Sequence, residues 1–181
     1  EDSVTQGFYV KGWHGINIEP VPQHAAKFVA ARPRDINLMV AVSNREGSAL
    51  MHAIGDTGLS TLSEVEAKRH ALTGRESLVE EVKTTTLAQI CVEHVTGPVH
   101  FLKVDVEGAE LSVLQGMDFK ACRPWVVVVE ATVPGSPIES YSEWEPILLD
   151  CDYVFVYFDG LNRYYVSQEM ERELRPSFRC P

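Results

Sequence analysis

Carboxylates stand where the apolar runs of this sequence end, and they are the side chains best suited to chemistry. They are Glu19, Asp105, Glu107, Glu130 and Asp159. A carboxylate at the end of a strand can accept both hydroxyl hydrogens of a ribose, take up a proton as a general base when burial raises its pKa, or bind a cation. Ligands of open parallel sheets bind beyond the carboxyl ends of the strands. The pattern therefore predicts an acidic site along one edge of a sheet.

Glu19 is interpreted as the residue that holds ribose hydroxyls, because it ends a short strand where Pro20 removes a backbone donor. Nucleotide sites use a carboxylate in the same way. The sequence has no G-x-G-x-x-G motif and no G-x-x-x-x-G-K-[ST] loop, however, and these are the segments that cradle diphosphates. The pattern therefore favours a nucleoside ligand that carries no diphosphate.

Asp105 and Glu107 are the predicted catalytic pair. Side chains alternate along a strand, so both carboxylates face the same way, and Gly108 permits a tight turn or the close approach of a ligand. We predict that Asp105 is the general base, because it stands at the tip of a central strand. Glu107 and Glu110 have a second interpretation, in which they only complement the positive end of the following helix.

The turn from Asp159 to Arg163 is a predicted contact with a hydroxyl-rich acceptor. It gathers Asp159, Asn162 and Arg163 at one rim, and Glu130 ends a strand at the same predicted edge. These four residues are the candidate substrate-binding set. The alternative interpretation of the turn is structural, as the tight connection of a hairpin.

Metal binding is the weaker interpretation of the acidic residues. The six histidines include no pair with the H-E-x-x-H spacing, and the four cysteines include no C-x-x-C pair. Asp105 and Glu130 offer oxygen ligands, which leaves a cation as an alternative, but no metal site is predicted. The cysteines are expected to be free thiols: Cys91, Cys122, Cys151 and Cys180.

Alternating strands and helices must position these residues. We expect helices at 3–11 (capped by Ser3), 22–32, 86–94, 109–117 and 141–149, a helix or mobile loop at 62–74, and strands at 15–20, 37–42, 48–54, 78–84, 100–106, 125–129, 153–158 and 163–166. The nearly continuous apolar run at 37–42 is typical of a strand buried on both faces, and 78–84 of an edge strand. Strands separated by helices predict an α/β fold with a mostly parallel, doubly wound sheet. The four-residue connection between the last two strands requires an antiparallel hairpin.

Length and charge restrict the function classes. A chain of 181 residues fits one domain, predicted over residues 1–181. With 16 basic and 26 acidic residues the formal charge is −10, which argues against a nucleic-acid partner. No apolar run approaches the roughly 18 residues of a membrane span. No signal peptide is visible at the start, so a cytoplasmic location is expected.

Several segments, in the expected order, resemble FkbM-type methyltransferases. They are residues 12–20 (GWHGINIEP), 58–61 (GLST), 84–90 (TTTLAQI), 101–110 (FLKVDVEGAE) and 159–165 (DGLNRYY). The resemblance implies the Rossmann-like fold of class I methyltransferases, in which a C-terminal antiparallel hairpin completes the sheet. The family's first strand and its glycine-containing cofactor loop, of the Asp-x-Gly-Ala-Asn type, are expected just before Glu1, so the domain is expected to be N-terminally incomplete.

The resemblance also implies an activity. It is that of an S-adenosylmethionine-dependent O-methyltransferase, acting on a hydroxyl of a sugar, glycan or natural product. The residues expected at the cofactor are Glu19, Pro20, Val42, Ser43 and Asp105. Two alternatives stay open: an NAD-type Rossmann oxidoreductase, and a methyltransferase-like module without catalytic activity.

Overall fold

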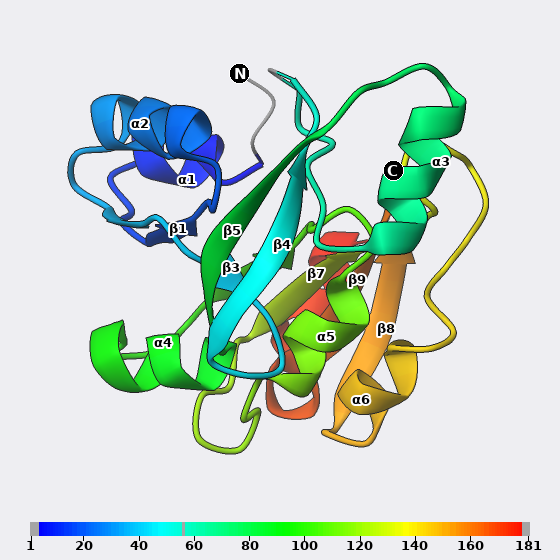
Figure 1. Cartoon of the computed structure of the whole chain (residues 1–181). Helices are drawn as coiled ribbons and strands as arrows, with labels where there is room; N and C mark the ends of the chain where they lie inside the picture. Colours follow the sequence, from blue (N-terminus) through cyan, green and yellow to red (C-terminus); the bar gives the residue numbers. More distant parts are fainter. Residues whose placement is uncertain (1–3, 56, 179–181) are drawn as a thin grey trace.

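A computed structural model describes residues 4–55 and 57–178 of the chain. Its strands form three hydrogen-bonded sheets, and helices lie around them. In Figure 1, α1, α2 and β1 lie to one side, the long strands β4 and β5 cross the middle, and β7, β9 and β8 form the opposite part. The predicted Ser3 cap lies outside the described residues.

The first sheet is a β-α-β unit. Strands β1 (Ile16–Ile18) and β2 (Ile36–Leu38) pair in parallel, and α2 (Pro22–Ala31) connects them. Pro22 suits the first turn of α2, because the backbone N–H that proline lacks would have no helical partner there. The short helix α1 (Gln6–Val10) precedes the unit.

The second sheet has the order β3-β5-β4, formed by β3 (Ala41–Val42), β5 (Leu78–Thr85) and β4 (Gly47–Ala53). Two expectations were wrong here. The predicted strand 37–42 divides between β2 and β3, because the chain changes sheets there and leaves Met39 62% exposed. The predicted edge strand 78–84 is the central strand of this sheet, since β5 pairs with both neighbours.

Two helices flank β5. The segment 62–74 contains α3 (Glu64–Leu72), whose N-cap Ser63 accepts a hydrogen bond from the backbone N–H of Glu66. After β5, Thr86 caps α4 (Leu87–His94) in the same way. These local caps explain why both helices begin where they do.

The third sheet has the order β6-β7-β9-β8. Its strands are β6 (Phe101–Val104), β7 (Val126–Glu130), β8 (Tyr153–Phe158) and β9 (Asn162–Ser167), with α5 (Glu110–Gln115) after β6 and α6 (Glu145–Leu149) before β8. Strands β6 and β7 are parallel, whereas β9 pairs antiparallel with β7 and β8. The predicted terminal hairpin is confirmed.

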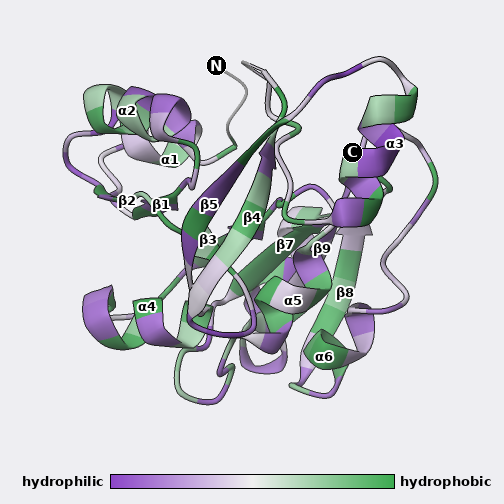
Figure 2. Cartoon of the chain, viewed as in Figure 1, coloured by the Kyte–Doolittle hydropathy of each residue, from purple (hydrophilic) through white to green (hydrophobic). Residues whose placement is uncertain are grey.

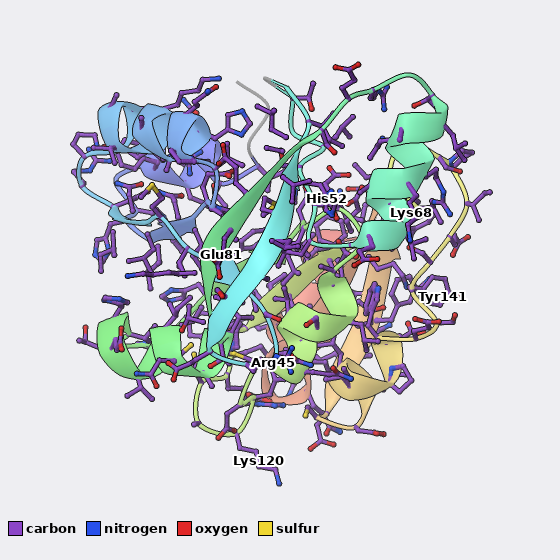
Figure 3. All side chains as sticks on the ribbon, in the orientation of Figure 1. Arg45, His52, Lys68, Glu81, Lys120 and Tyr141 are labelled. Atoms are coloured by element: carbon purple, nitrogen blue, oxygen red, sulfur yellow. The ribbon has the colours of Figure 1, made fainter. Side chains whose placement is uncertain are left out.

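Both faces of this sheet are covered. Val127, Val129 and Tyr165 are fully buried in the main core, and burying a side chain of this kind contributes about 1.5–3 kcal/mol. Val126 and Val128 face a smaller cluster, which the C-terminal helices α7 (Glu171–Leu174), η1 (Gln168–Met170) and η2 (Arg175–Phe178) cover. Figure 2 shows β7 and β8 mostly in the green of hydrophobic residues, whereas α3 is largely hydrophilic. Charged side chains such as Lys68 and Lys120 project outward (Figure 3).

The architecture is therefore mixed α/β. Among the described residues the strand pairs divide equally, three parallel and three antiparallel, so these sheets are not mostly parallel as predicted. Within the same part of the chain, no helix combines the length and apolar character that crossing a membrane requires.

Candidate functional site

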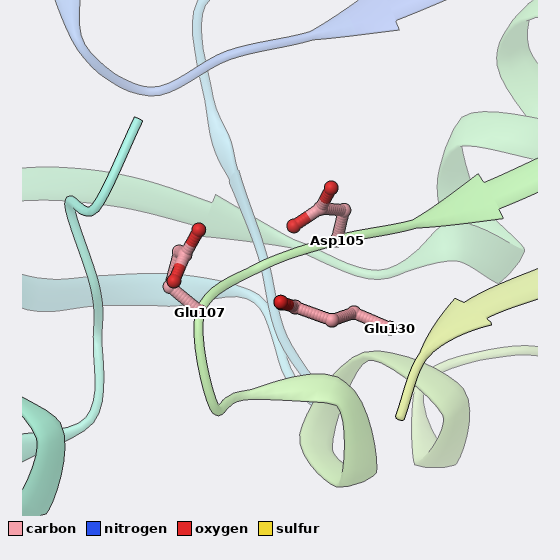
Figure 4. Close-up of side chains that lie close together, drawn as sticks. All are labelled: Asp105, Glu107 and Glu130. Carbon is pink, nitrogen blue, oxygen red and sulfur yellow. The ribbon is translucent and has the colours of Figure 1, made fainter. Parts of the chain in front are cut away.

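Three predicted site residues meet at the carboxyl ends of β6 and β7. One carboxylate oxygen from each of Asp105, Glu107 and Glu130 lies within 4.8 Å of the others. The two strands are parallel neighbours with Val104 opposite Val129, so their ends fall at the same edge. Figure 4 shows the three carboxylates directed toward one space. We call these three residues the acidic cluster.

The turn after β6 orients Glu107. Glu107 and Gly108 both have positive φ values, 53° and 94°, so the chain reverses sharply at this point. Glu110 Oε1 accepts hydrogen bonds from the backbone N–H groups of Val106 and Gly108, each at 3.2 Å, and Thr61 Oγ1 donates to the Glu107 carbonyl at 2.7 Å. Glu110 thus stabilises the turn that precedes its helix.

Two residues of the cluster, Glu107 and Glu130, hold protons more tightly than free carboxylates do. Burial, followed by repulsion from Asp105, Glu110 and Glu66, raises the pKa of Glu107 to about 7. Burial and the charges of Asp105 and Glu107 raise the pKa of Glu130 to about 9. The Lys103 ammonium lies 2.7 Å from Asp105 Oδ2 and offsets part of this negative charge.

Glu19 lies directly after β1, as predicted. Its Oε1 accepts a hydrogen bond from the backbone N–H of Val21 at 2.8 Å, across Pro20, and burial raises its pKa. The side chain borders a cavity of about 220 Å³ between α2 and the two strands of the first sheet, whose lining includes Phe28 and Leu38.

The segments that precede β1 and β6 contact each other, and these strands lead to Glu19 and to the acidic cluster. The Trp13 ring, which precedes β1, lies 5.1 Å from the ring of His100, which precedes β6. Glu19 follows the end of β1 and Asp105 follows the end of β6. The residues that line the cavity beside Glu19 include neither Asp105 nor the other two residues of the acidic cluster.

Val42 is buried and Ser43 is partly exposed. Val42 is 9% exposed and belongs to the main core. Ser43 Oγ lies 3.0 Å from Ser112 Oγ on α5. A Cβ atom on Gly116 would lie only 2.3 Å from the Ser43 carbonyl, so the end of α5 packs directly against this backbone. The described contacts of both residues are therefore with the protein itself.

The candidate substrate residues fall on two faces of the sheet. Asn162 lies directly opposite Glu130 in the β7–β9 pair, so the structure brings these two together. Asp159 accepts hydrogen bonds from the backbone N–H groups of Leu161 and Asn162 and from the Tyr164 hydroxyl. Partial burial opposes ionisation of Asp159, but these hydrogen bonds outweigh it and lower the pKa of the carboxyl.

Arg163 points to the other face and is held firmly. Its guanidinium carbon lies 3.7 Å from the centre of the Tyr141 ring, which is labelled in Figure 3, and 3.9 Å from that of Phe155. The same group donates to Glu145 at 2.9 Å and to the Tyr165 hydroxyl at 3.0 Å. These contacts give Arg163 a clear structural role.

Sequence reasoning missed the contribution of α3. Glu66 is 7% exposed and packs over the turn, since a Cβ atom on Gly108 would lie 2.7 Å from Glu66 Cγ. The S-x-x-E spacing of Ser63 and Glu66 is the signature of a capping box, and it could have located this helix.

Comparison with protein families decides the identity. The family described as Methyltransferase FkbM domain matches residues 1–155. The chain belongs to the FkbM methyltransferase family. This membership confirms the resemblance and supports a methyltransferase activity; Asn162 and Arg163 lie beyond the matched residues. Comparisons with curated proteins and with solved structures gave no match.

Proposed function

We propose that this FkbM methyltransferase transfers a methyl group from S-adenosylmethionine to a hydroxyl oxygen of a sugar, glycan or natural product. The observation that carries the proposal is the acidic cluster, three carboxylates within 4.8 Å at the carboxyl ends of two parallel strands. Ligands of α/β sheets bind at this position, and removal of a hydroxyl proton needs a base there.

The residues around Glu19 fit the nucleoside part of the cofactor. A carboxylate borders a cavity whose lining is largely apolar, with Ala25, Phe28 and Val29 from α2. Glu19 would accept the ribose hydroxyl hydrogens, and Pro20 would fix the backbone beside it. Asp105 would lie near the methionine part. When bound, S-adenosylmethionine supplies a methyl group on a positively charged sulfur.

The chain must then position the acceptor and remove its proton. The bound cofactor would supply its methyl carbon to the acceptor oxygen and would keep the electron pair of the broken carbon–sulfur bond on sulfur. The hydroxyl proton passes to the Asp105–Glu107 pair. A pKa of about 7 suits Glu107 to this task near neutral pH, because a base works best when its pKa is close to the operating pH.

Oxygen-rich side chains favour a hydroxyl-bearing acceptor over an apolar one. Glu130 and Asn162 are opposite partners on β7 and β9, and both reach the same edge as the acidic cluster. Carboxylate and amide groups can accept and donate hydrogen bonds to neighbouring hydroxyls of one sugar ring.

Calorimetric titration with S-adenosylhomocysteine tests the cofactor. We expect the parent chain to bind S-adenosylhomocysteine. Glu19→Gln should bind it at least about tenfold more weakly, because a hydrogen bond to a charged group is lost. The control is Glu64→Gln on α3, whose side chain is 76% exposed. Binding of NADH instead would favour the oxidoreductase, and binding of neither ligand the non-catalytic module.

The catalytic assignment has its own test. Asp105→Asn is expected to bind S-adenosylhomocysteine within about tenfold of the parent chain, yet to lose methyl transfer to a sugar acceptor by about 100-fold or more. Full turnover in both Asp105→Asn and Glu107→Gln would remove the proposed base.

A further inference from the structure

We propose that the acidic cluster, Asp105, Glu107 and Glu130, binds one divalent cation of the class that prefers oxygen ligands. The sequence alone did not favour a metal, because no histidine or cysteine spacing indicates one. The tertiary structure places three carboxylates from two strand ends around one space (Figure 4). Carboxylates are the ligands typical of Mg²⁺, Ca²⁺ and Mn²⁺.

The spacing of the oxygens agrees with a shared ion. Two ligands on opposite sides of a cation are separated by twice the metal–oxygen distance, which is about 4.8 Å for a distance of about 2.4 Å. The three oxygens lie within 4.8 Å of one another, so small movements of the side chains would bring all of them to the binding distance of one ion. A smaller ion such as Mg²⁺ would draw them slightly closer.

Glu130 provides an observation that acidity alone does not. It is 6% exposed, its carboxyl group shares a hydrogen bond with Asp105, and its Oε2 has no hydrogen-bond partner among the described residues. Surface carboxylates often cluster without a ligand, but water solvates them. Burial of a carboxyl oxygen without a partner is costly, and the Glu130 side chain is directed toward the same space as those of Asp105 and Glu107 (Figure 4). A bound cation would supply the missing partner.

The nearby groups leave room for such an ion. Lys103 brings one positive charge, and its ammonium bonds to Asp105 Oδ2, while the Asp105 carboxyl also shares a hydrogen bond with Glu130. Glu107 Oε2 is also buried without a partner in the described part of the chain. Asn162, opposite Glu130, has a buried Oδ1 that also lacks a hydrogen-bond partner among the described residues, and it offers a neutral oxygen at this edge.

The role of the cation in methyl transfer rests on the proposed function, whereas its binding does not. At the cluster the ion would face the acceptor hydroxyl, lower the pKa of that group, and balance the negative charge of the carboxylates. An acceptor with two adjacent hydroxyls would suit it best, because both oxygens could approach one ion.

The test is a titration with Mn²⁺ alone, without cofactor or acceptor, in which electron paramagnetic resonance measures the free ion. We expect one Mn²⁺ per chain, competed by Ca²⁺, and binding weakened about tenfold or more in Glu130→Gln and in Asp105→Asn. Glu64→Gln, on exposed α3, should bind as the parent chain does. A second measurement is the melting temperature, which Mn²⁺ should raise in the parent chain and not in Glu130→Gln.

The outcomes separate this inference from the proposed function. Undetectable binding at millimolar Mn²⁺, or equal binding by Glu130→Gln and the parent chain, would overturn the cation site. Mn²⁺ binding in a chain that fails to bind S-adenosylhomocysteine would support the site and refute the proposed function. Folding of each variant is checked by circular dichroism, and a failure of Glu130→Gln to fold leaves Asp105→Asn as the deciding variant.

Discussion

Replacing Arg163 should destabilise the fold through the loss of a specific set of contacts. Its guanidinium lies between the rings of Tyr141 and Phe155, 3.7 and 3.9 Å from their centres, and bonds to Glu145 at 2.9 Å. The Arg163 side chain is only 12% exposed and that of Glu145 18%. The interaction is therefore poorly screened by water.

The magnitude follows from these contacts. Removing one partner of a buried ion pair lowers the free energy of unfolding by about 3–5 kcal/mol. Because the Arg163–Glu145 pair is partly exposed, we expect Arg163→Met to lower it by about 3 kcal/mol. Arg163→Lys keeps the charge but loses the planar stacking, so we expect about 1–2 kcal/mol. Adding Glu145→Gln to Arg163→Met should recover about 1 kcal/mol, because the orphaned carboxylate is removed.

Urea unfolding followed by circular dichroism measures all four free energies of unfolding. If Arg163→Met lowers the free energy of unfolding by less than about 0.5 kcal/mol, the structural role of Arg163 is refuted, because substitutions of ordinary surface residues have effects of this size. In that case a raised KM for the acceptor with unchanged stability would favour the substrate-binding role that the sequence predicted.

Three other perturbations have defined outcomes. The folded chain keeps a proton on Glu130 up to a pKa of about 9, whereas the unfolded chain loses it near a pKa of 4.5. Between these pH values the free energy of unfolding, measured in urea with a chelator, should fall with rising pH by up to about 1.4 kcal/mol per pH unit. Glu130→Gln should make this pH dependence weaker. Gly108→Ala should cost about 2 kcal/mol in urea unfolding, more than Gly160→Ala, because both glycines have similar positive φ but only the first new Cβ meets Glu66; equal losses would contradict the contact. Burial raises the pKa of Cys91 to about 12, so iodoacetamide should label it about 100-fold more slowly than glutathione by mass spectrometry, and rapid labelling would show an accessible thiolate.

Local signals predicted the elements well. The short connection between β8 and β9 required an antiparallel pair, and Thr86 marked the start of α4. The strand from Val126 to Glu130 is buried, as the uninterrupted apolar residues 126–129 suggest. These features depend on residues close together in the chain, so periodicity and turn length are sufficient to find them.

Pairing between distant strands was less predictable. The apolar run at 37–42 looked like one strand, but the chain passes from the first sheet to the second within it. Strand β5 has exposed side chains over much of its length and therefore resembled an edge, although its backbone pairs on both sides. Side-chain patterns report burial of the faces and say little about the hydrogen bonds along the edges.

Part of the candidate site was likewise predictable from local sequence, and the rest depended on pairing between distant strands. The sequence by itself determined that Asp105, Glu107 and Glu130 follow strands, because a carboxylate ends an apolar run, and its motifs indicated the FkbM family. Only the tertiary structure decided that these three carboxylates converge while Arg163 turns away to the rings beside it. The reason is physical: alternation along a strand fixes the face that a side chain occupies, but the parallel pairing of β6 with β7 fixes which charges must share one space.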